Sequence, residues 1–370
     1  MRCKRIILYF LMCASLTSIF LSSGCGSGEK DASDVIANTN VRHREARFYY
    51  SNELVRSDQK IVLLNDHPEF VQPLEQDTYL NAPMLLNDPD ADIFVKAWRF
   101  SYNARDVIVT PNAISGKNTA IIVVHPWGVD DDQNYNSPDP YGVALFCTPE
   151  KNAIYHKHLK NVVMPFIESM KGIVKFTGYS LPGHEDEIRK HMYRSIDNND
   201  IDPAKGRDKF NELLKNKNLT GGSLKVNLNL PGGGQTFLEY FNTFSGLDSS
   251  QRYNGSFWEV PMPLASSVKP GENDFVIYDA DGYEKLRDYL KKEGIYNILL
   301  CGYATDMCVI STTAGYNNLR QDFNVFIVGD AGLATFPGQE TPAYATSAAL
   351  AFASLNNFIT QISWIKEIKN

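Results

Sequence analysis

The sequence predicts an α/β fold: a doubly wound parallel sheet flanked by helices, with an N-terminal extension and a long insertion. Two observations carry this prediction. From residue 117 onward, short all-apolar runs alternate with amphipathic stretches at helical spacing, which is the pattern of a parallel sheet covered on both faces. The chain, at 370 residues, is also long enough to bury the core of one large domain.

Apolar runs bounded by turn residues define the strands, and amphipathic segments between or after them define the helices. The predicted strands are residues 120–124, 173–177, 275–278, 298–301 and 325–328. The predicted helices are residues 155–169, 282–292, 308–320 and 343–356. In the second helix, Leu286, Tyr289 and Leu290 share one face. Five strands alternating with helices make a doubly wound order the natural architecture.

The chain before the main domain, which is predicted at residues 117–365, has three parts. Residues 1–25 have the layout of an export signal, and Cys25 at their end resembles the acylated lipobox cysteine of bacterial lipoproteins, although the usual leucine three places earlier is a serine. Residues 26–46 form a polar tether, and residues 47–116 an extension of short strands and loops. We therefore expect an exported protein, lipid-anchored in the bacterial cell envelope on the periplasmic side; a plain cleaved signal or an uncleaved anchor is the alternative.

A long insertion interrupts the main domain at about residues 195–273. This stretch is polar and rich in glycine, proline and asparagine, and it carries several aromatic residues, Trp258 among them. A segment of this length between strands is commonly a functional cap or lid. A surface insertion without a function is the alternative.

Charge and cysteine content exclude some classes of partner. The formal net charge of −7 argues against nucleic acid, because phosphate-binding surfaces concentrate lysine and arginine. No Cys-x-x-Cys pair or zinc-type His/Cys spacing is present, so neither a metal nor another cofactor is expected. His156, His158, His184 and His191 are instead expected on helix surfaces. If Cys25 is lipidated, the three thiols left after the signal are an odd number, so at least one stays free.

One cysteine occupies a position suited to catalysis. The apolar run 298–301 ends at Gly302, and Cys308 opens the next predicted helix. Ligands of parallel α/β sheets bind beyond the carboxyl ends of the strands, and a thiolate at a helix N-terminus is stabilised as a nucleophile. Free backbone amides there could hold an oxyanion. Without further context, a small core residue would be the ordinary interpretation of this cysteine.

The residues around Cys308 change that interpretation. The segment 302–309, GYATDMCV, followed by Thr313-Ala314 and Gly329-Asp330-Ala331, resembles the Gly-Val-Ala-Thr-Asp-x-Cys-Val block of the isochorismatase-like cysteine hydrolases. That family cleaves carbon–nitrogen bonds in small amides, carbamoyl and ureido compounds. The resemblance spans about residues 117–360 and implies Cys308 as nucleophile, the backbone amides of Ala304 and Cys308 as oxyanion donors, and a non-proline cis peptide in the preceding turn.

The other catalytic residues of that family do not transfer. Its aspartate ends the first strand, where this chain has His125, and its lysine follows the third strand, where this chain has Tyr278 and Asp279. His125 could serve Cys308 as base and acid, oriented by Asp279 or by one of the three aspartates Asp130, Asp131 and Asp132. A degenerate site that only binds a ligand, and a hydrogen-bonded core histidine, stay open as alternatives.

Aromatic residues beside these positions suggest a pocket for a flat or partly apolar substrate. Trp127, Tyr278 and Tyr303 are expected to line it, with core packing as the alternative for each. The resulting hypothesis is a cysteine hydrolase acting on a small-molecule amide. The alternative is a catalytically inactive envelope protein that binds a small ligand or partner in the same pocket. The family resemblance also admits a homo-oligomer.

Overall fold

Eleven strands form one mixed sheet in the computed structural model. The structure describes residues 55–57, 67, 79–101, 106–128, 149–216, 261–334 and 357–368. Six parallel strands carry the predicted architecture, in the order β8, β7, β6, β9, β10 and β11. They are β6 (Thr119–Val124), β7 (Phe176–Leu181), β8 (Phe275–Tyr278), β9 (Asn297–Tyr303), β10 (Asn324–Leu333) and β11 (Ile359–Glu367). The order reverses between β6 and β9, as in a doubly wound sheet, so the predicted fold class is confirmed.

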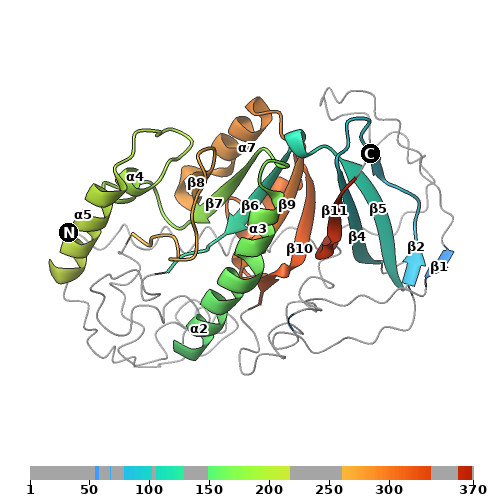
Figure 1. Ribbon diagram of the computed structural model, residues 1–370, viewed down its shortest axis with the longest axis horizontal. Coiled ribbons are helices and arrows are strands. Elements are labelled where there is room, and N and C mark those ends of the chain that lie inside the picture. The colour runs from blue at the N-terminus through green and yellow to red at the C-terminus, as the bar shows by residue number, and fades with distance from the viewer. Residues whose placement is uncertain are drawn as a thin grey trace, which may run out of the picture. The chain divides into compact units, whose positions relative to one another are not determined.

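Helices cover both faces of these strands (Figure 1). One face packs against α2 (Pro149–His158), a π-helical turn (Leu159–Val163), α3 (Met164–Met170), α4 (Arg189–Met192) and α5 (Pro203–Asn216). The other face packs against α7 (Tyr283–Lys292), α8 (Cys308–Ser311) and α9 (Tyr316–Leu319). The described residues also include two short 3-10 turns, Gly116–Asn118 and Asp279–Asp281. Among the described residues, no helix is long and apolar enough to cross a membrane.

The N-terminal extension differs from the expected short strands and loops. Two nine-residue strands, β4 (Ile93–Ser101) and β5 (Asp106–Ile114), pair antiparallel and join the main sheet, because β4 pairs with β11. The short strands β1 (Val55–Ser57), β2 (Tyr79–Asn81) and β3 (Leu86–Asn87) lie beyond β5 or pair with it. Ile93, Val95 and Ala97 alternate into the core, which is why β4 belongs to the sheet.

Other predicted elements need correction. The predicted helix 308–320 is two helices of four residues each, separated at residues 312–315. The predicted strand 173–177 lies at Phe176–Leu181 instead, and β11 was not anticipated. A 14-residue helix, α5, lies in the part of the insertion that the structure describes. The predicted helix 343–356 lies outside the described residues, as does most of the insertion.

Gly302 allows β9 to approach β6 closely at the point where the strand order reverses. Its φ is +111°, and a Cβ at this position would lie 2.2 Å from the carbonyl oxygen of Val124. We expect Gly302→Ala to lower the free energy of unfolding by about 3 kcal/mol, because overpacking adds to backbone strain. Urea denaturation measures this loss. Gly172→Ala is the matched control: its φ is +78° but nothing lies within 4 Å of an added Cβ, so a loss of about 1 kcal/mol is expected from strain alone. Equal losses in the two variants would contradict the steric argument.

Candidate active site at the carboxyl ends of β6, β8 and β9

The structure brings the three predicted catalytic residues together at the carboxyl edge of the sheet. His125 directly follows β6, Asp279 directly follows β8, and Cys308 opens α8 after β9. Nε2 of His125 lies 2.6 Å from Oδ2 of Asp279, and Cys308 lies near enough to the same imidazole ring to raise the pKa of His125. The lone pair of a carboxylate oxygen requires a donor, so Nε2 carries the proton and Nδ1 is the ring nitrogen left for the thiol.

His125 is held by its backbone as well as by its ring. Its φ is +53°, an uncommon backbone conformation for a residue with a side chain. Its N–H donates to the carbonyl oxygen of Ser180 at 3.1 Å, and the ring of Trp127 stacks on it with centroids 4.5 Å apart. The imidazole, 6% exposed, therefore has little freedom to turn.

Charges in the site favour an ion pair. Burial alone would lower the pKa of His125, but the negative charges of Cys308 and Asp279 and the hydrogen bonds to both raise that pKa to about 10. Burial alone would raise the pKa of Asp279, but the charge of His125 and hydrogen bonds from His125, Thr312 and Ser180 hold it below its usual value. The pair is therefore an imidazolium and a carboxylate at neutral pH.

Three hydroxyl residues that sequence reasoning missed hold Asp279. Ser180, at 0% exposure on β7, donates from its Oγ to Oδ1 of Asp279 at 2.7 Å. The side chain of Thr312 hydrogen-bonds the same carboxylate, and the hydroxyl of Thr313 donates to the carbonyl oxygen of Asp279. Thr312 and Thr313 lie where the predicted helix 308–320 breaks, so the break places both hydroxyls against Asp279. Ser180 lies on the strand between the two strands that carry His125 and Asp279, and this position could have indicated its role. The predicted strand, however, stopped at residue 177.

Cys308 differs from the other cysteine that the structure describes. Cys301 is 1% exposed in the core, and burial raises the pKa of its thiol, whereas Cys308 is half-buried beside His125. The helix that Cys308 opens has only four residues, so its dipole is small. The helix dipole that the sequence suggested beside Cys308 is therefore weak.

The turn before Cys308 has the features expected for an oxyanion site. The peptide between Tyr303 and Ala304 is cis, where the family resemblance implied such a bond. Within the described part of the chain, no hydrogen bond uses the backbone N–H of Ala304 or of Cys308. Both amides are therefore available to a substrate oxygen.

Of the three predicted pocket residues, Trp127 stacks on the candidate catalytic residue His125. Tyr278 is 1% exposed, and its ring lies under the guanidinium of Arg189 at 4.9 Å. Tyr303 is also 1% exposed, and its hydroxyl is 2.7 Å from Nδ1 of His158. The predicted pocket role of Tyr278 and Tyr303 is thus replaced by core packing, because both rings belong to the buried cluster under α2, α3 and α5.

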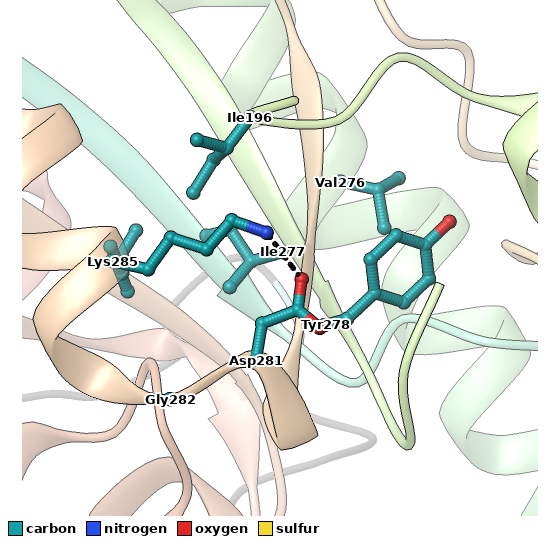
Figure 2. A pocket seen from close by; sticks show the side chains of 8 residues that line it. Ile196, Val276, Ile277, Tyr278, Asp281, Gly282 and Lys285 are labelled. Carbon is teal, nitrogen blue, oxygen red and sulfur yellow. Dashed lines mark hydrogen bonds and ion pairs between the residues drawn. The ribbon is translucent and has the colours of Figure 1, made fainter. Parts of the chain in front are cut away.

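A lysine near β8 does not replace the missing family lysine. Lys285 lies beside a narrow cavity next to Tyr278, where its Nζ pairs with Asp281 at 2.9 Å (Figure 2). The same Nζ pairs with Asp197 at 2.5 Å. Lys285 is therefore committed to two carboxylates, and His125 is the cation beside Asp279.

The histidines that were expected on helix surfaces differ in their burial. His184 pairs with Asp281 at 3.3 Å on the surface, while His158 is fully buried rather than on a helix surface. No group of three or more His, Cys, Asp or Glu side chains in the described ranges could hold a metal ion. Five predicted residues lie outside the described residues: Cys25, Asp130, Asp131, Asp132 and Trp258.

Part of the chain is similar to a known protein family. Residues 261–360 match the Isochorismatase domain model. No curated protein matches the chain. Among solved structures, a cysteine hydrolase from Pseudomonas syringae pv. phaseolicola 1448A is 15% identical, with 68% of this chain and 91% of that chain covered and a TM-score of 0.33. An isochorismatase family protein from Desulfovibrio vulgaris subsp. vulgaris str. Hildenborough is 12% identical (66% and 95% covered, TM-score 0.35). The nicotinamidase from Staphylococcus aureus is 12% identical (66% and 99% covered, TM-score 0.31).

The family match falls on the part of the chain that carries the motif. It begins before β8 and ends in β11, so it includes both Asp279 and Cys308. The resemblance predicted from the cysteine motif is therefore confirmed over residues 261–360, which are similar to the Isochorismatase domain.

Proposed function

We propose that this protein is a cysteine hydrolase that cleaves the carbon–nitrogen bond of a small amide through Cys308. One observation carries the proposal: Nε2 of His125 is 2.6 Å from Asp279, at the edge of the sheet where Cys308 opens α8 and raises the pKa of His125. This is a nucleophile, a proton carrier and an orienting carboxylate in sequence, the arrangement of Cys-His hydrolases. The Isochorismatase domain match, whose family hydrolyses amide-type bonds, supports the reaction class.

Acylation follows from the charges of the site. The sulfur of Cys308, as thiolate beside the imidazolium of His125, attacks the amide carbon and forms a C–S bond. The carbonyl oxygen takes the negative charge and accepts hydrogen bonds from the amides of Ala304 and Cys308. When the C–N bond breaks, His125 donates its proton to the leaving nitrogen, and ammonia or an amine departs. A thioester on Cys308 remains.

Deacylation reverses the proton movements. The imidazole of His125, now neutral, takes a proton from a water molecule as that water attacks the thioester carbon. The C–S bond breaks, the carboxylic acid product leaves, and Cys308 returns as thiolate beside the imidazolium. Asp279 stays ionised throughout, since it hydrogen-bonds Nε2 and receives bonds from Ser180 and Thr312.

In the proposed site, the cation and the anion have exchanged positions relative to the family that the chain resembles. The anion of that family follows the first strand and its cation follows the third, whereas here the cation His125 follows β6 and the anion Asp279 follows β8. The two side chains still meet across β7, where Ser180 accepts a hydrogen bond from the backbone N–H of His125 and donates one to the carboxylate of Asp279. An ion pair of opposite polarity can therefore occupy the same edge of the sheet.

Alkylation by iodoacetamide tests the proposal on the purified protein. We expect Cys308 to be labelled at pH 7 about 10-fold faster in the wild type than in His125→Ala, because the imidazolium stabilises the attacking thiolate. Mass spectrometry of the peptide that contains Cys308, prepared from each of the two proteins, measures the labelling rates. The buried Cys301 is the internal control that stays unlabelled in the folded protein. Equally slow labelling of Cys308 in both proteins would reject the hydrolase and leave a protein that binds its ligand without turnover.

We also propose that the enzyme acts in the cell envelope, held by a lipid on Cys25. The basic and apolar layout of residues 1–25 supports this. Cells grown with radiolabelled palmitate are expected to incorporate label into the protein and to lose that label in Cys25→Ser. Equal incorporation by the two proteins, or none by either, would reject the lipid anchor.

A further inference from the structure

A buried histidine outside the proposed catalytic triad contacts the turn that carries the oxyanion amides. His158 is the last residue of α2 and has 0% exposure. Its Nδ1 lies 2.7 Å from the hydroxyl oxygen of Tyr303, and its Nε2 lies 2.8 Å from the carbonyl oxygen of Asp330. A histidine buried in an apolar layer is costly unless both ring nitrogens are satisfied, as they are here.

The partners determine which nitrogen carries the proton. The carbonyl oxygen of Asp330 can only accept, so Nε2 of His158 donates to it. Burial raises the pKa of Tyr303 well above its usual value, so its phenol keeps its proton and donates to Nδ1. His158 therefore links the end of β9 to β10 through two directed bonds.

Further contacts hold Tyr303 on the same side. The ring of Tyr155, also on α2, meets the ring of Tyr303 edge to face with centroids 4.7 Å apart. The hydroxyl of Tyr155 donates to the carbonyl oxygen of Ala334 at 2.6 Å. The π-helical turn Leu159–Val163 begins directly after His158, and such turns are frequent at functional sites. α2 therefore holds both the ring and the hydroxyl of Tyr303.

Tyr303 is bonded directly to Ala304, one of the two residues whose amides are available for a substrate oxygen. A side chain whose ring and hydroxyl are both held by α2 limits rotation of the peptide plane that contains the Ala304 N–H. We propose that His158 is a positioning residue, which holds Tyr303 so that the amide of Ala304 points at the oxyanion. This inference rests on the proposed function, because an oxyanion forms only if Cys308 attacks a carbonyl.

Two reactions of Cys308 separate this role from a general loss of structure. Alkylation by iodoacetamide forms no oxyanion, whereas acylation by p-nitrophenyl acetate passes through a tetrahedral intermediate that has one. We expect Tyr303→Phe, which removes only the hydroxyl group, to lower the acylation rate about 10-fold while alkylation changes less than about twofold. His158→Gln keeps a donor for the Asp330 carbonyl but not the ring acceptor, and it should lower the ratio of the two rates similarly.

The control and the double variant sharpen the test. Tyr283→Phe loses a hydroxyl bond of the same length, 2.7 Å to Asp322, away from the oxyanion turn, and should leave the ratio unchanged. The double variant Tyr303→Phe/His158→Gln should fall no further than either single variant, because both remove one shared contact. An unchanged ratio in Tyr303→Phe and His158→Gln, or an equal fall of both rates, overturns the positioning role. A wild-type Cys308 that reacts with neither reagent rejects the proposed function itself.

Discussion

Replacing Asp279 by asparagine is expected to lower kcat for amide hydrolysis about 10⁴-fold with little change in KM. The substitution keeps the size of the side chain but removes the charge that stabilises the imidazolium of His125 and orients its Nε2–H. Loss of the carboxylate in a triad has an effect of this order, because the histidine adopts the wrong tautomer. The rates are measured as ammonia release from the best amide found in a library screen.

Asp281→Asn is the matched control for this substitution. Asp281 lies two residues further on and pairs with Lys285 and His184 rather than with His125, so its hydrolysis rate should stay within about twofold of the wild type. A variant Asp279→Asn that retains most of the activity would show that His125 needs no carboxylate. In that case the triad would have to be abandoned.

The pH dependence of hydrolysis by the wild type and by Asp279→Asn tests the ion pair of His125 and Asp279. Hydrolysis requires protonated His125 to release the leaving nitrogen, so activity should persist into alkaline solution and fall as pH rises through the raised pKa of His125, about 10. Asp279 is one cause of that raised pKa. The fall should therefore begin at lower pH in Asp279→Asn, and an alkaline limit that does not move would contradict the assignment.

Replacing Cys308 by alanine should produce the largest loss, at least about 10⁵-fold in kcat, since no thioester can form. Mass spectrometry of the acid-quenched reaction should detect an acyl adduct on Cys308 in the wild type and none in the variant. The same variant should lower the pKa of His125, because the charge of Cys308 is the largest of the contributions that raise it. NMR titration of the His125 ring measures that shift.

Cys301→Ala is the control, because this thiol is 1% exposed and lies in the core. It should retain hydrolysis near the wild-type rate. Persistent hydrolysis or an acyl adduct in Cys308→Ala would exclude Cys308 as the nucleophile. Retained ligand binding without any hydrolysis in the wild type would instead favour the inactive binding protein that the sequence left open.

The strands that the sequence predicted best are the ones with continuous apolar runs. β6 and β8 lie within one residue of their predicted bounds, since TAIIVV and FVIY are buried along their whole length. β7 was placed too early because Gly178, Tyr179 and Ser180 within it form no apolar run, although all three residues are buried. β11 was missed because ITQISWIKE mixes polar and apolar residues, as befits a strand that pairs with β4 and is partly exposed.

The sequence by itself determined the fold class, the position of Cys308 after a buried strand, and the pairing of His125 with an aspartate as one hypothesis. These follow from local periodicity and from a motif within one turn. Only the tertiary structure decided that Asp279 is the carboxylate beside His125, that Ser180, Thr312 and Thr313 hold it, and that His158 holds Tyr303. The bonds of Asp279 with His125, Ser180 and Thr313 and of His158 with Tyr303 join residues 34 to 154 positions apart. Hydrogen bonds between such distant residues depend on strand order and register, which no local pattern specifies.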